Sequence, residues 1–322
     1  MGRFDDRATR PGRGPADILK WKFGRGEPRR ADYAVLDAVR PGTRAGGAAA
    51  LASGAPCAVW IGHATWAVRL GGQLVVVDPI WSRAIGGAVR RLVEPGVPLA
   101  EMPPVDIVLV THDHRDHMDL PTLRKLPDTA TYIVPLGNGG RLGKPNVVEL
   151  DWWQSHQLGA LTITLVPARH WSMRMPWNRN DTLWGGYVVR GPEGAAYHSG
   201  DTAWGDHFAE IGQRLGPIDW AMLPIGAYAP RWFMEPQHMD PDEAARGFEA
   251  LGARNLLAMH WGTFKLTDEA VGEPPERLRA WWRARELPPE RLWICDVGEA
   301  RALGDRESFA ASGDRLVGLR RP

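Results

Sequence analysis

Four potential metal ligands lie within six consecutive positions of one predicted loop, and this feature constrains the chain more than any other. The loop reads His112-Asp113-His114-Arg115-Asp116-His117 and follows Val105–Val110, an apolar, β-branched run that predicts a buried strand. A strand fixes one end of the loop, so that its imidazoles and carboxylate can surround a cation such as zinc. An ordinary polar loop is the alternative, but so dense a cluster would be costly to hold together without a metal.

The composition limits the class of protein. The chain has 322 residues, 44% of them hydrophobic, enough for one large α/β domain or two smaller ones. Its net charge of +1 gives no reason to expect a nucleic-acid partner. No stretch approaches the roughly 20 apolar residues that span a bilayer. The Arg-rich amino terminus lacks the apolar segment of a secretory signal, so we expect a cytoplasmic protein.

Two cysteines, Cys57 and Cys295, lie far apart in the sequence. Two buried free thiols are the simpler interpretation in a reducing compartment, and a disulfide between them is the alternative. Neither lies in a Cys-x-x-Cys pair. Any metal would therefore be held by histidines and carboxylates.

Residues 1–55 differ in composition from the rest of the chain. They are rich in Arg, Gly and Pro and predict an N-terminal arm, which precedes a folded domain at 56–322. Within the arm, Ile18–Phe23 mixes lysines with apolar side chains. This segment is either a short helix docked on the domain or a segment that rests on a lipid headgroup layer.

The domain is dense in short apolar runs that are typical of strands. We expect strands at Ala58–Ile61, Ala67–Leu70, Leu74–Val77, Val105–Val110, Tyr132–Val134, Leu161–Val166, Gly186–Val189, Ala195–His198, Trp220–Pro224, Asn255–Met259 and Leu292–Cys295. Helices are expected at Pro121–Lys125, from Asp240 to Gly252, and at Glu276–Arg285. Hairpins interrupted by helices favour an α+β fold, a four-layer αββα sandwich of two mixed sheets.

Three further candidate ligands follow predicted strands. His170 comes after Leu161–Val166, Asp201 after Ala195–His198, and His260 directly after Asn255–Met259. Alone, each would more often be a surface or core residue. Strand ends open onto a common rim, however, so these side chains are expected to converge on the loop. Seven ligands suit two ions: His112, His114 and His170 for the first, Asp116, His117 and His260 for the second, and Asp201 as a bridge.

Two residues of the early strands have expected roles beside this centre. Asp78 ends Leu74–Val77 and is a candidate to fix the tautomer of a ligand imidazole. Its alternative role is to start a turn before Pro79. His63 lies in a Gly-His-Ala turn and is a candidate for lining the same rim, in contact with substrate.

Longer motifs give the chain a family resemblance. They are Trp60-Ile61-Gly62-His63-Ala64-Thr65, Asp78-Pro79-Ile80-Trp81-Ser82, His170-Trp171, Gly200-Asp201-Thr202, Pro224–Tyr228, Pro230–Met234, Gln237-His238-Met239-Asp240-Pro241 and His260-Trp261-Gly262-Thr263-Phe264. With the histidine loop, they resemble the metallo-β-lactamase fold superfamily and, within it, the N-acylphosphatidylethanolamine-hydrolysing phospholipase D family. The resemblance covers about residues 58 to 275, whereas the arm and the last fifty residues match poorly.

The resemblance implies a hydrolase with two Zn²⁺ ions per subunit that cuts the phosphodiester of N-acylphosphatidylethanolamine. Its products would be phosphatidic acid and an N-acylethanolamine. In this family the seven ligands fall at the positions assigned above, and Gln237 and His238 would line the phosphate site. The resemblance also implies a homodimer in peripheral contact with a membrane. The Arg-rich arm of this chain is shorter than the arm of the family pattern and departs from it.

The expected chemistry follows from the charge of the substrate. A phosphodiester is anionic, so its hydrolysis needs charge neutralisation and a strong nucleophile, which two ions about 3.5–4 Å apart supply. We expect Asp116, Asp201 and His238 to be the catalytic residues. Asp201 would orient the attacking water, and His238 would hold a phosphate oxygen or protonate the leaving alkoxide. A solvent-facing histidine at a helix N-terminus is the alternative for His238.

Two other functions remain open at this point. The first is a metal-dependent hydrolase of another phosphodiester, a lactone or a thioester on the same fold. The second is a di-iron redox or oxygen-sensing protein, which would carry a carboxylate in place of an imidazole. His114 favours zinc, with iron and manganese as alternatives.

Overall fold

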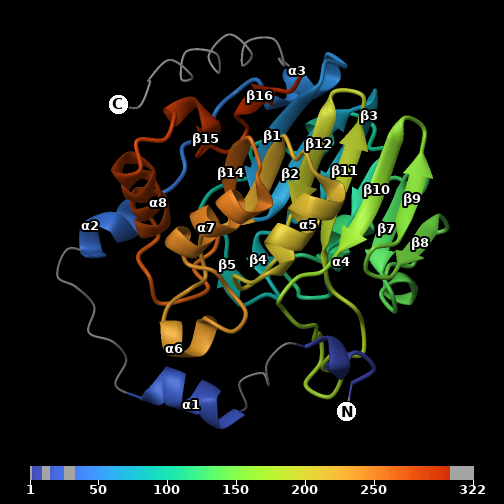
Figure 1. Cartoon of the computed structure of the whole chain (residues 1–322). Coiled ribbons are helices and arrows are strands. Elements are labelled where there is room, and N and C mark those ends of the chain that lie inside the picture. The colour runs from blue at the N-terminus through green and yellow to red at the C-terminus, as the bar shows by residue number, and fades with distance from the viewer. Residues whose placement is uncertain (1, 9–14, 25–32, 305–322) are drawn as a thin grey trace, which may run out of the picture.

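The computed structural model describes residues 2–8, 15–24 and 33–304, whose body consists of two seven-stranded sheets (Figure 1). Neighbouring strands of the first sheet are β16 (Ala300–Ala302), β1 (Cys57–Gly62), β2 (Thr65–Leu70), β3 (Gln73–Val77), β6 (Ile107–Leu109), β7 (Thr131–Pro135) and β8 (Val147–Leu150). Those of the second are β15 (Leu292–Trp293), β14 (Asn255–Met259), β13 (Trp220–Pro224), β12 (Gly194–His198), β11 (Gly186–Gly191), β10 (Leu161–Val166) and β9 (Ser155–Leu158). A hairpin of β4 (Ala84–Ile85) and β5 (Val89–Arg90) forms a separate small sheet.

Both sheets are mixed in the same way. In the first, β16 through β3 pair antiparallel and β3 through β8 pair parallel. In the second, β9 through β12 pair antiparallel and β12 through β15 pair parallel. Parallel pairs need long crossover connections, and most of the helices of the domain lie in them.

Helices cover the outer face of each sheet. On the second sheet lie α5 (His207–Leu215), α7 (Pro241–Leu251) and α8 (Glu273–Ala284) (Figure 1). Their buried side chains belong to the same apolar core as those of its strands. On the first sheet, α3 (Gly47–Ala52) and α4 (Leu120–Leu123) contribute Leu51 and Leu123 to a second apolar cluster, which also contains strand residues of that sheet. The predicted αββα sandwich is therefore confirmed.

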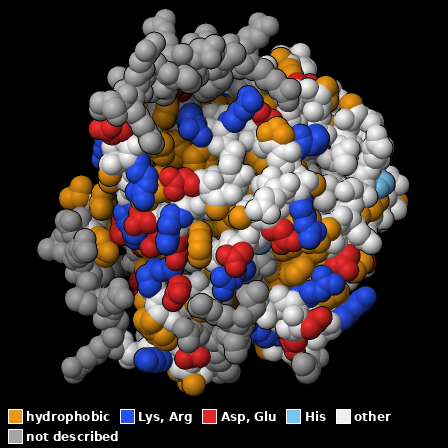
Figure 2. All heavy atoms as spheres, in the orientation of Figure 1, with side chains coloured by type: hydrophobic (Ala, Val, Ile, Leu, Met, Phe, Trp, Pro, Cys, Tyr) orange, Lys and Arg blue, Asp and Glu red, His pale blue; other side chains and the backbone are white. Residues whose placement is uncertain are grey.

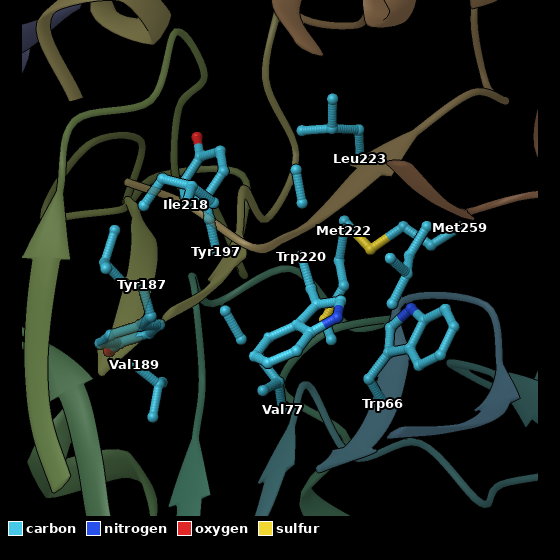
Figure 3. Packing of buried hydrophobic residues seen from close by; sticks show 14 of the residues in the cluster. Trp66, Val77, Tyr187, Val189, Tyr197, Ile218, Trp220, Met222, Leu223 and Met259 are labelled. Carbon is cyan, nitrogen blue, oxygen red and sulfur yellow. The ribbon is translucent and has the colours of Figure 1, made fainter. Parts of the chain in front are cut away.

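Large side chains fill the space between the two sheets. Trp66 and Val77 of the first sheet lie opposite Trp220 and Met222 of the second (Figure 3). Each of these residues alternates with a neighbour that points to the outer face, as the two-residue period of a strand requires. Burial of such side chains contributes roughly 1.5–3 kcal/mol each and holds the sheets face to face.

Helix α7 begins and ends as its sequence predicts. Asp240 accepts a hydrogen bond from the backbone N–H of Glu243 at 2.9 Å, and the Glu243 carboxylate accepts one from the N–H of Asp240 at 3.1 Å. This capping box contributes about 0.5–2 kcal/mol. Gly252 ends the helix with φ of 67°, the left-handed conformation that glycine adopts at low cost. The helix start fixes the segment that carries His238.

The described parts of the N-terminal arm contact the domain. Trp21 of α1 (Pro15–Phe23) packs against Phe233 of α6 (Arg231–Met234) at 4.9 Å between ring centroids. Backbone of α2 (Tyr33–Ala38) accepts a hydrogen bond from Gly272. Segments 9–14, 25–32 and 305–322 lie outside the described residues. A domain boundary at residue 55 stays a prediction.

Some elements have no counterpart among the predicted ones, notably β8, β9, β16 and α5. Strand β9 reads Ser-His-Gln-Leu, in which polar residues occupy both faces, so a two-residue apolar period is missing. Cys57 and Cys295 are buried free thiols, as expected. Within the described ranges, no helix has both the length and the apolar character needed to cross a bilayer. Acidic and basic side chains are intermixed on the face that carries α7 and α8 (Figure 2).

Candidate metal centre

Strand direction brings the candidate ligands to one edge of the sandwich. Strands β10, β12, β13 and β14 run in the same direction, because β10 and β12 are both antiparallel to β11 and the rest pair parallel. His170, Asp201 and His260 follow three of these strands. The loop His112–His117 follows β6 of the other sheet. Ligands from both sheets therefore meet where these strands end.

One group of ligands consists of three imidazoles. His112 Nε2 lies 2.9 Å from His114 Nδ1, and His170 Nε2 lies 3.2 Å from the same atom. The nitrogens of all three lie within 4.8 Å of one another. The structure thus brings together the set that the sequence assigned to the first ion.

A second group contains Asp116, His117 and His260, and His63 joins them within the same 4.8 Å limit. Asp201 lies between the two groups. Its Oδ2 atom is 3.1 Å from His117 Nε2 and 3.9 Å from His170 Nε2, and its Oδ1 atom is 3.2 Å from His260 Nε2. A carboxylate placed in this way can bridge two ions.

Unpaired polar atoms show that these residues fit a metal. Within the described part of the chain, His117 Nε2, His260 Nε2 and Asp201 Oδ1 are buried and make no hydrogen bond. They lie close to oppositely charged groups without hydrogen-bond geometry, with His117 Nε2 and His260 Nε2 at 3.1 and 3.2 Å from the Asp201 carboxylate. Several of them facing one small volume is what a cation site requires, and nitrogen and carboxylate ligands suit zinc.

Outer hydrogen bonds orient two of the candidate ligand imidazoles. Asp78 Oδ2 accepts a hydrogen bond from His117 Nδ1 at 2.7 Å, and the carbonyl oxygen of Gln237 accepts one from His170 Nδ1 at 3.0 Å. Nδ1 carries a proton in both rings, so Nε2 is the nitrogen that would bind a metal. Thr111 completes this support, because its side chain contacts both Asp78 and His112.

The protonation states fit a metal site. Burial lowers the pKa of His114 to about 3 and that of His170 to about 4, so both are neutral ligands near pH 7. Burial would raise the pKa values of Asp116 and Asp201, but the facing charge of His117 holds both well below the usual value. Burial likewise opposes the charge of His117, but Asp201, Asp116 and Asp78 raise its pKa well above the usual value. A divalent ion would take the place of that proton.

His238, Gln237 and His63 were expected to contact substrate, and they occupy different positions. His238 is 8% exposed, and its ring lies 5.2 Å from that of His170. Gln237 supplies its backbone carbonyl to His170, while its side-chain amide contacts Met234 Sδ at 3.8 Å. His63 is 1% exposed, and its Nε2 atom lies 3.0 Å from Asp116 Oδ2. Their substrate contacts stay predictions.

Sequence reasoning missed two supporting residues. Thr111 directly precedes the histidine loop, and only this adjacency could have indicated its role. Trp171 lies edge-on against the ring of His114, with 4.6 Å between centroids. Its position directly after His170 is the sequence signal for this contact.

Comparison with known proteins identifies the superfamily and the family of the chain. Residues 73–261 match the family model described as the β-lactamase superfamily domain. The chain is similar to an uncharacterised protein of Mycobacterium tuberculosis, at 43% identity over 69% of this chain and 62% of that protein. It is also similar to N-acyl-phosphatidylethanolamine-hydrolyzing phospholipase D 1 of Caenorhabditis elegans, at 36% identity over 77% of this chain and 76% of that protein. The chain thus spans less than two thirds of the mycobacterial relative.

Among solved structures, isothiocyanate hydrolase from Delia radicum gut bacteria has the same fold. The TM-score is 0.62 at 21% identity, with 76% of this chain and 98% of that chain covered. The fold and the family match place the chain in the metallo-β-lactamase fold superfamily. Within that superfamily, the chain belongs to the family of N-acylphosphatidylethanolamine-hydrolysing phospholipase D-like proteins.

Proposed function

We propose that the protein is a dinuclear zinc phosphodiesterase of the phospholipase D type. It would release an N-acylethanolamine and phosphatidic acid from N-acylphosphatidylethanolamine. The observation that carries this proposal is the position of Asp201 between two ligand groups, with His238 beside it. Similarity to the Caenorhabditis elegans phospholipase supports the choice of bond.

The ligand assignment is part of the proposal. His112, His114 and His170 would hold one ion, Asp116, His117 and His260 the other, and Asp201 would contact both. Two bound divalent ions would supply activated water and neutralise phosphate charge. The catalytic roles of Asp116 and Asp201 would be to hold the two ions in place and to accept the proton of the attacking water.

His238 is the proposed contact for the phosphate or the leaving oxygen. Its Nδ1 atom is buried and makes no hydrogen bond within the described residues. It groups with His170 and Asp201 in the metal cluster. Arg231 fixes the backbone at this position by donating to the carbonyl oxygen of His238 at 3.0 Å. A fixed imidazole with an unused nitrogen can donate to a phosphate oxygen or to a departing alkoxide.

Exposed apolar side chains at the same end of the sandwich support a lipid substrate. Phe23 of α1 is 84% exposed and Trp177, in the loop after β10, is 76% exposed. Figure 1 places α1 and this loop at the end where β10 terminates. Lys20 and Lys22 accompany Phe23 on α1. Apolar and basic side chains together suit the surface of an anionic membrane. We propose a cytoplasmic protein in peripheral contact with the membrane, active as a homodimer.

The test measures hydrolysis of lipid vesicles by protein reconstituted with Zn²⁺. N-acylphosphatidylethanolamine, plain phosphatidylethanolamine, a lactone and a thioester are compared, with products identified by mass spectrometry. We expect N-acylethanolamine and phosphatidic acid in equal amounts and slower turnover of the plain lipid. Asp201→Asn serves as the inactive control. Turnover of the lactone or thioester alone would instead support another hydrolase of this superfamily.

A further inference from the structure

A buried histidine in the turn between β1 and β2 has a strained backbone. His63 has φ of 54°, in the left-handed region, and its side chain is 1% exposed. Such a conformation costs on the order of 1–3 kcal/mol and persists only where the surrounding structure enforces it. Residues held in this way often have a functional reason for their orientation.

Both sheets hold this turn in place. The carbonyl oxygen of His63 accepts hydrogen bonds from Trp60 Nε1 at 2.9 Å and from the N–H of His260 at 3.0 Å. Its N–H donates to Thr263 Oγ1 at 2.7 Å. His198 Nε2, from the second sheet, contacts the carbonyl oxygen of the next residue at 2.8 Å. These contacts come from β1, β12 and the loop after β14, so the backbone that carries the imidazole is fixed.

The imidazole contacts the carboxylate of a candidate ligand. His63 Nε2 lies 3.0 Å from Asp116 Oδ2, whereas the nitrogens of His117 and His260 lie 3.6 and 3.7 Å from the same oxygen. An ionised carboxylate only accepts hydrogen bonds, so Nε2 of His63 carries the proton. A protonated Nε2 has no lone pair to offer an ion.

Ring contacts fix the remaining freedom of this side chain. The His63 ring packs on His260 at 4.1 Å and meets the edge of Phe264 at 5.2 Å. The Arg91 guanidinium lies over the ring of Phe264, 4.8 Å from its centroid. The His63 imidazole therefore contacts both the candidate ligand His260 and the ring of Phe264. Its shortest polar contact is with Asp116.

We propose that His63 is a positioning residue that holds the Asp116 carboxylate toward the second ion through an Nε2–H donor. The inference rests on the proposed dinuclear centre but not on the proposed substrate. Hydrogen bonds to ligating groups typically change metal affinity by about 10–100-fold when removed. His63 would thus act through Asp116, without contacting either substrate or ion.

A pair of amide variants tests this role. In His63→Gln the side-chain amide reaches the position of Nε2 and keeps a donor for Asp116. In His63→Asn the amide is one methylene shorter and loses that contact, although Asn tolerates the left-handed conformation better than Gln. A purely structural role of His63 and a role in positioning Asp116 therefore predict opposite rankings of the two variants in zinc affinity. Backbone strain alone favours His63→Asn, whereas positioning of Asp116 favours His63→Gln. His156→Gln, in strand β9, is the matched control.

The measurement is Zn²⁺ affinity of chelator-treated protein by competition with a chromophoric chelator. We expect His63→Asn to weaken the second ion about 10–100-fold. His63→Gln should stay close to wild type, and the first ion should be unchanged in both. Equal loss in the two variants, or none in His63→Asn, would overturn the proposal. Substrate is absent from this assay, so its result is independent of the proposed phospholipase activity.

A second measurement uses the wild-type protein and does not depend on folding of a variant. Histidine ¹⁵N NMR reports which ring nitrogen carries a proton, and the His63 signal is assigned by its loss in His63→Gln or, failing that, by its contact with the Phe264 ring. The His63 Nε2 proton is expected to persist when two equivalents of Zn²⁺ are added. Loss of this proton on zinc binding would identify His63 as a direct ligand and refute the positioning role.

Discussion

Replacing Asp78 by Asn would change one atom of the group that orients His117. The Asp78 side chain is fully buried and accepts three hydrogen bonds, each 2.7 Å long. The donors are Thr111 N, Thr111 Oγ1 and His117 Nδ1. Asn keeps the size of the side chain and suits the φ of 46° at this position. The substitution therefore tests hydrogen bonding with little change in shape.

The new amide nitrogen would replace Oδ2, the oxygen that His117 contacts. Two donors would then face each other, and the imidazole resolves this by moving its proton from Nδ1 to Nε2. Nε2 is the atom that lies 3.1 Å from Asp201 and would bind the second ion. We expect affinity for that ion to fall at least about 10–100-fold. Metal-free protein should lose about 1–3 kcal/mol of unfolding free energy for the contact with His117.

Zinc titration of chelator-treated protein and urea unfolding at pH 7 measure the two quantities. Asp106→Asn is the matched control, because Asp106 Oδ2 accepts the N–H of Leu74 at 2.7 Å in the same sheet, and the Asn oxygen can take its place. The control should bind two ions with wild-type affinity. If Asp78→Asn also binds the second ion normally, the tautomer of His117 does not control that site and the reasoning is wrong.

Three other predictions follow from the same centre. His112→Ala and Asp201→Asn should each lower hydrolysis at least about 100-fold with the far-ultraviolet circular dichroism unchanged, and full activity in either variant removes that residue from the centre. In metal-free protein, burial would lower the pKa of His260, but Asp201 and Asp116 raise it to about 9. This pKa exceeds that of an unfolded histidine, about 6.5, so protonation of His260 stabilises the fold fully below pH 6.5. This contribution to the free energy of unfolding, at most about 3 kcal/mol, is lost as pH rises through about 9 and is measured by urea unfolding. A flat profile from pH 6.5 to 9.5 would contradict it. Finally, the double variant Phe23→Ser/Trp177→Ser should sediment with anionic vesicles several-fold less than wild type, whereas the control Val35→Ser should not change. Equal vesicle binding by all variants argues against the proposed membrane contact.

The sequence predicts the convergence of ligands because that convergence depends on strand direction. His170, Asp201 and His260 each follow an apolar run, and such runs, once placed in a sheet, deliver their next residues to a shared edge. Only the order of residues is needed for that argument. Strand β9 (Ser155–Leu158) was not predicted, because its sequence has no apolar pattern. Its position in the sheet depends on pairing with β10.

The orientation of individual side chains is not contained in the order of residues. His63 is predicted to line the substrate site, and its backbone is held by Thr263, which is 200 positions away in the sequence. Gln237 is predicted to line the phosphate site, and its backbone carbonyl accepts a hydrogen bond from His170. In each case a hydrogen bond between distant segments holds the backbone in place, and no local sequence pattern predicts it.

Protons and metal ions compete for the same position in this centre. His117 faces Asp116 and Asp201, and without a metal it keeps a proton because those carboxylates remain charged while buried. The proton supplies the positive charge that two desolvated carboxylates need. An ion that takes this place must displace the proton, so zinc affinity should fall as pH is lowered and binding should release protons. The same ions would join ligands from the two sheets, β6 on one side and β10, β12 and β14 on the other. Binding energy at this edge is therefore also energy that holds the sandwich together.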